Sequence, residues 1–255
     1  MDVCDRNAAY GRPQWVQAGG GAFDLTADYC FPKNSELSAY IIVTLYVKTA
    51  DAMGANIVNT MAEKLLDEMV KEYQDEYPCE RGFAIVTNAS FERRAFAKVE
   101  IPFGILPQDQ ARKLALASDV ARTNRARAVT NHKGIMNGVI AAALPLGQDT
   151  RAIEAAFYDL ARKNSEDSYA LSKWTLQQDH LKGELLAELP VGFVGGSRSN
   201  PAFDTAFKFD GIENYTDLCS VLASVGLASN FAALWALTTD GIQAGHMKLH
   251  ARKAE

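Results

Sequence analysis

The sequence has few of the features that mark disulfide-rich or metal-binding proteins. Its four cysteines, Cys4, Cys30, Cys79 and Cys219, are far apart, and none forms a CxxC pair or another short metal-ligand spacing. This pattern argues against a disulfide scaffold and against a cysteine-based zinc site, and it is typical of reduced thiols in a cytoplasmic protein. We therefore expect a cytoplasmic chain without a bound metal.

Other features that the sequence lacks exclude further classes of protein. Basic residues do not predominate: 26 Lys and Arg stand against 31 Asp and Glu, and a net charge of -5 argues against nucleic-acid binding. No GxGxxG motif supports a Rossmann domain. The longest apolar runs, such as residues 139–146, are shorter than a bilayer requires, and Asp2 and Asp5 make the N-terminus unlike a signal peptide. A globular chain with no membrane span and one or two domains is the expectation.

The spacing of apolar residues predicts an α+β fold in two parts. In the first part the order β-α-β-β is predicted: a mostly buried strand over 40–47, a helix over 56–73, and strands over 82–88 and 96–101. In the second part helical patterns predominate: helices are predicted over 109–122, 149–163 and 215–238, and a strand over 181–189. We place the division near residue 90, giving a small α+β domain over 1–90 and a larger helix-rich domain over 91–255.

The first segment that could carry chemistry is DAMGANIVNTMAE, Asp51–Glu63, between a predicted strand and a predicted helix. A strand, a turn containing Gly54 and a helix N-terminus together can bind a phosphate, because unpaired backbone N–H groups and the helix dipole favour anions. Alternatively, Gly54 serves only to relieve a tight turn. The residues alone leave both interpretations open.

The second segment is RAVTNHKGIMNG, Arg127–Gly138, followed by an aspartate at 149. We expect Lys133, beside Gly134, to lie in a polar turn where it could approach a substrate. Asp149 could hold the Lys133 ammonium group charged and oriented, and such a pair can stabilise an oxyanion. The alternative is a surface lysine and an unrelated aspartate that caps a helix beginning near Thr150.

The third segment is DGIQAGHMKLHAR, Asp240–Arg252, in which His246 follows Gly245. A histidine can donate a proton to a departing thiolate. His246 and His250 also have the spacing of two metal ligands on a helix, but no third ligand accompanies them.

These three segments in this order, together with GGGAFDL (19–25), TNASFERRAFAKVEIP (87–102) and LPVGFVGG (189–196), resemble the class II 3-hydroxy-3-methylglutaryl-coenzyme A (HMG-CoA) reductases. The resemblance implies reduction of HMG-CoA to mevalonate and coenzyme A with two NADH or NADPH, or the reverse reaction. It also implies a small ferredoxin-like domain that binds the dinucleotide, a larger domain that binds acyl-coenzyme A, and a homodimer with the active site between subunits.

The resemblance assigns roles to ten residues. Lys133 corresponds to the lysine that stabilises the oxyanion, Asp149 to its aspartate partner, and His246 to the histidine that protonates the coenzyme A thiolate. The cofactor loop is represented by Asp51, Met53, Gly54 and Asn56, and the substrate-binding positions by Arg127, Asn137 and Asn88.

The resemblance also implies that the family's catalytic glutamate and its mobile C-terminal flap lie outside this sequence. Two other functions therefore stand beside the reductase. One is a non-catalytic remnant that binds coenzyme A or nucleotide, or pairs with a full-length subunit. The other is a helix-bundle interaction module with no ligand.

Overall fold

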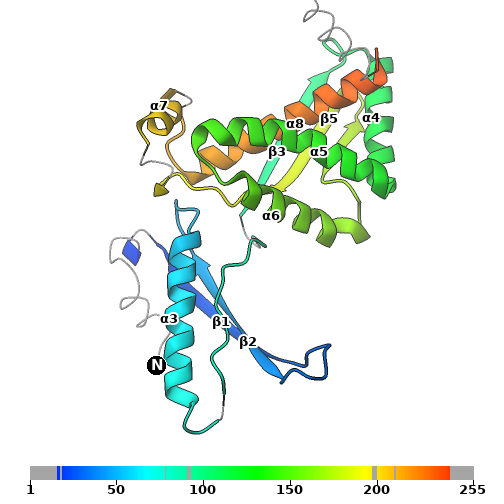
Figure 1. Cartoon of the computed structure of the whole chain (residues 1–255). Coiled ribbons are helices and arrows are strands. Elements are labelled where there is room, and N and C mark those ends of the chain that lie inside the picture. The colour runs from blue at the N-terminus through cyan, green and yellow to red at the C-terminus, as the bar shows by residue number, and fades with distance from the viewer. Residues whose placement is uncertain are drawn as a thin grey trace, which may run out of the picture. The chain divides into compact units, whose positions relative to one another are not determined.

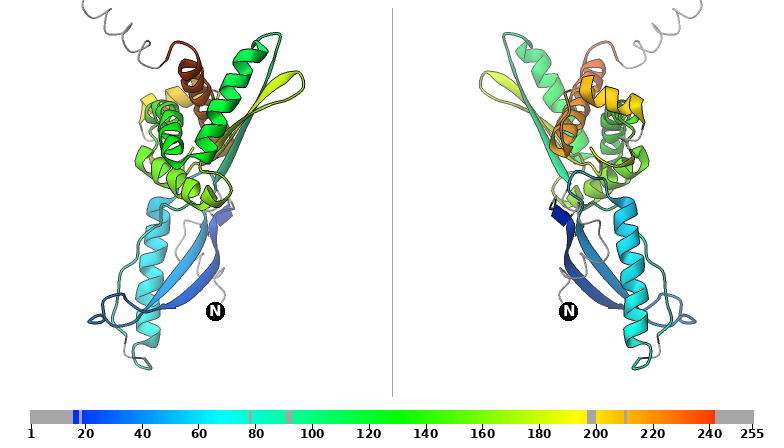
Figure 2. Two further views of the ribbon diagram at one scale, coloured as in Figure 1. Left: turned by 90° about the vertical axis from the view of Figure 1, so that its right-hand side faces the viewer. Right: turned by 90° about the vertical axis from the view of Figure 1, so that its left-hand side faces the viewer.

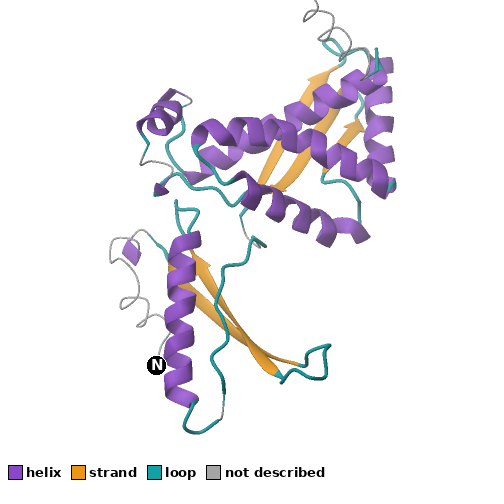
Figure 3. Ribbon diagram, in the orientation of Figure 1, coloured by secondary structure: helices purple, strands orange, loops and turns teal. Residues whose placement is uncertain are grey.

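The structure is a computed structural model that describes residues 16–17, 19–77, 79–90, 93–196, 200–209 and 211–241. The chain forms two compact units, residues 1–87 and 88–255 (Figure 1). Helices and antiparallel strands occur in both units, so the predicted α+β class is confirmed (Figure 3). The division between the units lies three residues before the position expected from the sequence.

The first unit contains a two-stranded antiparallel sheet and one long helix. Strands β1 (Gly21–Cys30) and β2 (Tyr40–Lys48) pair along their whole length, with an irregularity at Phe23. Helix α3 (Ala55–Tyr73) lies beside the sheet in all three views (Figures 1 and 2). The prediction of the helix is confirmed to within one residue.

The prediction that β2 is mostly buried is wrong. Tyr40, Ile41 and Ile42 are exposed, and the buried apolar side chains in the described part of this unit are Ala22 and Met61. One helix beside a two-stranded sheet cannot cover both faces of the sheet. Full burial would need more strands or a further layer. The apolar composition therefore predicted the strand correctly but not how far its side chains are buried.

The predicted strand over 82–88 is also not formed. Residues 79–90 form no regular secondary structure and pair with no described strand, and Phe83 and Ile85 are exposed. The segment is instead attached to α3, since the Val86 N–H donates to Asn59 Oδ1 at 2.7 Å. An alternating pattern predicts an extended backbone, whereas a strand also requires a hydrogen-bonded neighbour.

The second unit is built on a three-stranded antiparallel sheet in the order β3-β5-β4. The strands are β3 (Arg94–Pro102), β4 (Ser172–Leu176) and β5 (His180–Glu188). The helices are α4 (Gln108–Thr123), α5 (Arg125–Ala143), α6 (Thr150–Lys163), α7 (Pro201–Phe209) and α8 (Tyr215–Thr238), with single 3₁₀ turns at Leu144–Leu146 and Asn164–Glu166. Strands β1 and β4 and helices α5 and α7 were not predicted.

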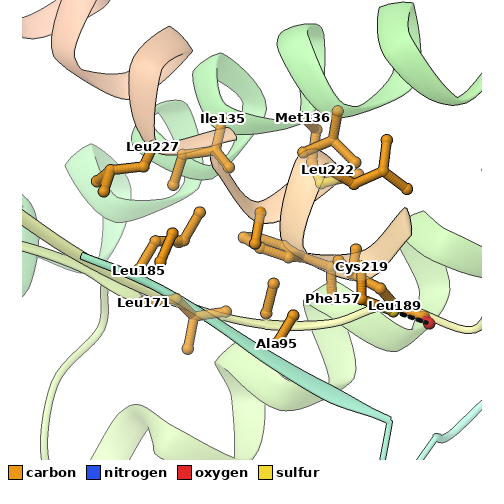
Figure 4. Packing of buried hydrophobic residues seen from close by; sticks show 14 of the residues in the cluster. Ala95, Ile135, Met136, Phe157, Leu171, Leu185, Leu189, Cys219, Leu222 and Leu227 are labelled. Carbon is orange, nitrogen blue, oxygen red and sulfur yellow. Dashed lines mark hydrogen bonds between the residues drawn. The ribbon is translucent and has the colours of Figure 1, made fainter. Parts of the chain in front are cut away.

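Helices α4 and α8 contact the sheet, and α5 packs closely against α8. Figure 4 shows Ile135 and Met136 of α5 meeting Leu222 and Leu227 of α8 above Leu185 of the sheet. Small residues make this close approach feasible. A Cβ atom on Gly138 would lie 2.7 Å from the Ser229 Cβ, and one on Gly226 would lie 2.9 Å from Val139 Cγ2. The crossing of α5 and α8 is therefore tightly specified.

Helix α8 corrects one expectation from the sequence. It spans 24 residues, as predicted, and by length and composition it could cross a membrane, so the estimate that every apolar run is too short was wrong. Within the unit, however, α8 is a core helix: Leu218, Leu222, Leu227 and Leu234 are buried. Its apolar character is accounted for by packing on several sides.

Glu188, at the end of β5, is a buried carboxylate with few partners. Its side chain is 1% exposed, and neither carboxylate oxygen accepts a hydrogen bond within the described part of the chain. The Arg94 Nε lies 3.5 Å from Oε1 across the β3-β5 ladder. Burial raises the pKa of Glu188 above its usual range; Lys163 and Arg94 oppose this shift, and Asp159 adds to it.

We expect a Glu188→Gln variant to gain stability relative to the wild type as the pH rises. Since the folded-state pKa is raised, the contribution of Glu188 to stability is complete below its unfolded pKa and is lost as the pH rises through the folded pKa. The gain should be about 1 kcal/mol at about pH 7 and vanish near about pH 4, as measured by urea unfolding. Glu100→Gln is the control: a hydrogen bond from the Lys98 ammonium group lowers the pKa of Glu100, so this variant should lose stability as the pH rises. An equal gain at both pH values would contradict the prediction.

Candidate functional site

In the first unit, the predicted strand–turn–helix arrangement is present. Strand β2 ends at Lys48, and α3 begins at Ala55 with Gly54 as its N-cap. Among the described residues no side-chain hydrogen bond caps this end of α3, and its first turn contains no acidic residue. Its N–H groups and the positive end of the helix dipole are thus available to an anion.

Gly54 is required by the backbone. Its φ is +91°, and a Cβ atom at this position would lie 2.2 Å from Thr49 Cγ2. The interpretation of Gly54 as a residue that relieves a tight turn is therefore confirmed. Asn56 in the first turn of α3 is exposed, so this role and the phosphate cradle are compatible.

The other predicted cofactor residues lie around the same turn. Asp51 and Asn56 are exposed, and Met53 is half-buried. The Asn56 carbonyl accepts a hydrogen bond from Thr60 Oγ1 within α3, and Asn56 itself lies in the first turn of the helix. The structure thus brings Asp51, Met53, Gly54 and Asn56 together.

In the second unit, Lys133 does not lie in a turn, and this prediction was wrong. It lies in the middle of α5, a helix whose N-cap, Asn124, accepts a hydrogen bond from the Arg127 N–H at 3.0 Å. Lys133 and Asn137 are both exposed, and because they are four residues apart they share one face of the helix. Polar character was mistaken for irregular structure.

Two buried side chains directly before Lys133 fix the rotation of α5. The Asn131 Nδ2 donates to Ser172 Oγ at 2.8 Å, and Asn131 Oδ1 accepts from Asn230 Nδ2 at 2.9 Å. The His132 Nε2 accepts from the Leu171 N–H at 3.1 Å. These bonds join α5 to β4, to α8 and to the backbone just before β4, so the face that carries Lys133 is held outward.

His132 is a packing residue rather than a charged one. Its ring lies edge-on to Phe157, with centroids 5.5 Å apart, and burial lowers its pKa to about 4. The ring is therefore neutral near pH 7, with Nε2 as the acceptor and the proton on Nδ1. From the sequence, His132 was expected to be an orienting or packing residue beside Lys133, and the structure confirms this. Asn131 was not identified as a support for Lys133; a polar residue on the apolar face of a helix was the available signal.

Arg127 is half-buried near the start of α5, and desolvation lowers its pKa, although the guanidinium remains charged. In the part of the chain that the structure describes, this guanidinium makes no ion pair or side-chain hydrogen bond. Arg127 lies six positions before Lys133, so their Cα atoms are about 9 Å apart along the helix axis and their side chains leave the helix about 120° apart. They could bind different parts of one ligand.

Asp149 caps helix α6, as the alternative interpretation predicted. Its Oδ1 accepts from the Arg151 N–H at 3.1 Å and from the Ala152 N–H at 3.2 Å. No hydrogen bond or ion pair between Asp149 and Lys133 is present in the described residues. The cap uses Oδ1, as does the Arg151 Nε at 3.9 Å, and no bond from the described residues uses Oδ2 of this half-exposed carboxyl group.

Two further residues predicted for the site are not placed beside Lys133. His246 lies outside the described residues, and Asn88 is an exposed residue at the start of the second unit. Among the residues that the structure covers, no cluster of three or more His, Cys, Asp or Glu side chains could hold a metal ion.

The hydroxymethylglutaryl-coenzyme A reductase family model matches residues 7–251. The chain belongs to this family. A probable HMG-CoA reductase of Borreliella burgdorferi is 38% identical over 218 residues, and the enzyme of Archaeoglobus fulgidus is 34% identical over 245 residues. These alignments cover 83% and 94% of this chain but 49% and 54% of the relatives. The chain thus spans about half the length of the HMG-CoA reductases that it matches.

Solved structures of the family agree. An HMG-CoA reductase of Streptococcus pneumoniae superposes with a TM-score of 0.80 at 35% identity, covering 97% of this chain and 59% of that one. A class II HMG-CoA reductase of the same organism, bound to NADPH in open conformations, also has a TM-score of 0.80, at 36% identity, with coverages of 98% and 60%. The resemblance to class II HMG-CoA reductases noted in the sequence is therefore confirmed.

Proposed function

We propose that this chain carries part of the catalytic machinery of an HMG-CoA reductase, which reduces HMG-CoA to mevalonate and coenzyme A with two NADPH or NADH. The observation that carries the proposal is the presentation of Lys133. Its ammonium group is exposed on a helix whose rotation is fixed by buried hydrogen bonds from Asn131 and His132. A cation presented from a fixed helix suits a carbonyl reduction, because the developing oxyanion requires a preorganised positive charge.

The residues of the second unit have complementary tasks. Lys133 would stabilise the oxyanion that forms on the thioester carbonyl and again on the aldehyde carbonyl. Asp149 would keep the lysine charged and oriented through the oxygen that does not cap α6. Arg127, half-buried and without a counter-ion among the described residues, is suited to the substrate carboxylate, and Asn137 lies one helical turn from Lys133 to hydrogen-bond near the carbonyl. His246 would protonate the departing thiolate.

The first unit would hold the cofactor. The uncapped N-terminus of α3 suits the pyrophosphate, with Gly54 allowing close approach of the backbone and Asp51, Met53 and Asn56 around it. The cofactor supplies the two hydrides. The S. pneumoniae relative bound to NADPH supports this assignment, and we extend it to NADH because the family resemblance implies either cofactor. We also propose a homodimeric assembly in the cytoplasm, as the family resemblance implies.

The proposal is tested with the purified full chain. HMG-CoA is added together with NADPH or NADH, and loss of nicotinamide absorbance is followed while mevalonate and coenzyme A are identified by mass spectrometry. We expect oxidation that depends on HMG-CoA, with two cofactor molecules consumed per mevalonate. Absence of turnover with both cofactors would exclude reductase activity for this chain on its own.

The alternative of a binding remnant is favoured by one observation, the absence of contact between Lys133 and Asp149. It is separated from the enzyme by measuring the melting temperature with coenzyme A and with NADPH. A ligand that binds the native state raises this temperature. A shift without turnover would support the remnant, and no shift with either ligand would support an interaction module.

A further inference from the structure

Gln148, immediately before Asp149, is the best-connected buried side chain near the proposed site. Its amide is 8% exposed, and both of its ends are used. The Nε2 group donates to the Leu146 carbonyl at 2.8 Å and to the Gly192 carbonyl at 3.0 Å, while Oε1 accepts from the Gly192 N–H at 2.8 Å. The Gln148 amide thus donates to Gly192 and accepts from it, as two directly paired residues do in an antiparallel sheet.

The partner of Gln148 is itself held firmly. Gly192 belongs to the 189–193 loop that follows β5. In this loop the Val191 carbonyl accepts from Arg93 Nη1 at 2.7 Å, and the Arg93 guanidinium lies 4.4 Å from the centre of the Tyr215 ring. The loop is thus attached to the start of β3 and to α8, and it provides a rigid support for the Gln148 amide.

The backbone on the other side of Gln148 is equally constrained. Its N–H donates to the Ala143 carbonyl at 3.1 Å, at the end of α5, the helix that carries Lys133. Gly147, just before it, has a φ of +67°, and a Cβ atom there would lie 2.5 Å from Phe203 Cδ2. Residues 144–149 therefore form a short connection that links the lysine helix to the α6 N-cap with little freedom.

We propose that Gln148 is a positioning residue that fixes the Asp149 carboxylate relative to Lys133 by clamping the α5–α6 connection to the 189–193 loop. The role in catalysis rests on the proposed function. Gln148 touches no reacting atom: it acts through Asp149, whose Oδ1 is committed to the α6 cap and whose Oδ2 direction depends on where residue 149 lies. Without the clamp, α6 can still form, but the aspartate loses its fixed position.

The test compares Gln148→Ala and Gln148→Glu with Gln110→Ala in the full chain. Gln110 is a matched control, since its Nε2 donates to Thr238 Oγ1 at 2.8 Å between α4 and α8, away from Asp149. For Gln148→Ala we expect kcat to fall about 100-fold, the loss typical of a misplaced catalytic group, with KM changed less than about threefold. Gln110→Ala should retain wild-type kcat even if its melting temperature falls equally.

Gln148→Glu preserves the side-chain volume, so it keeps the test decisive if the alanine variant does not fold. An ionised carboxylate cannot donate to the Leu146 and Gly192 carbonyls, so kcat should fall further as the pH rises through the titration of the new carboxyl group. Equal kcat in the wild type and in both Gln148 variants would overturn the proposal. So would a Gln148→Ala loss that Gln110→Ala reproduces.

A second readout does not depend on turnover. Hydrogen exchange of the Ala152 and Gly192 amides should become about tenfold faster in Gln148→Ala and remain unchanged in Gln110→Ala. If the wild-type chain shows no turnover, the proposed function fails, whereas the clamp is still supported by faster exchange at Ala152 and overturned by unchanged exchange there.

Discussion

Substitution of Lys133 by alanine is expected to lower kcat for HMG-CoA reduction by about 100- to 1,000-fold, the loss found when one oxyanion-stabilising group is removed. The lysine is exposed and makes no hydrogen bond or ion pair with other described residues, so its removal should not destabilise α5. KM should change little, because the charge interacts with the oxyanion more strongly than with the neutral carbonyl. Steady-state kinetics and urea unfolding on the same preparation separate the two effects.

Lys113→Ala is the matched control for this substitution. Lys113 is an exposed lysine on α4 of the same unit, and we expect it to be kinetically neutral. Lys133→Arg provides a second comparison: it keeps the charge but enlarges the group and moves it, so partial activity is expected. Wild-type kcat in Lys133→Ala would remove the lysine from the mechanism, and a matching loss in Lys113→Ala would show a non-specific effect.

The long elements of the fold could be predicted because their patterns are local. Helix α8 was placed at its observed bounds, and α3 and β5 to within one residue, since apolar periodicity over many residues reports directly on the buried face. The wrong predictions concern segments whose structure depends on contacts with residues far away in the chain. Residues 82–88 alternate like a strand but have no described neighbour to pair with, and β2 is apolar but lies in a sheet of only two strands.

The candidate site was predicted as a set of residues but not as a geometry. Lys133 was assigned to a polar turn because NHKG reads as irregular, yet Asn131 and His132 are polar residues buried by hydrogen bonds to other elements. Those partners lie about 40 residues further on in the chain at the nearest, so local sequence could not reveal them. The helix-cap alternative for Asp149, by contrast, is confirmed, because capping depends on the next three residues alone.

Gly54→Ala should have the largest effect on the first unit. The substitution places a Cβ atom 2.2 Å from Thr49 Cγ2 and forces alanine to a φ of +91°. Backbone strain and steric overlap together should cost about 3 kcal/mol at this turn. Because the substitution acts on one turn, the loss is best measured locally, as about 100-fold faster hydrogen exchange in the first turn of α3. Under the proposed function, NADPH affinity should fall with it.

Three comparisons separate strain from overlap in this turn. Gly19→Ala imposes a φ of +84° with no atom within 4 Å, so it should show the strain alone, and Gly82→Ala, which has neither problem, should be neutral. Thr49→Gly removes all three side-chain atoms that a Cβ on Gly54 would contact, so the double variant should recover about 1–3 kcal/mol relative to the sum of the single variants. Additive losses would show that overlap with Thr49 is not the cause. Wild-type exchange in Gly54→Ala would show that the turn accepts a side chain, and the case for a glycine-dependent cofactor cradle would then fail.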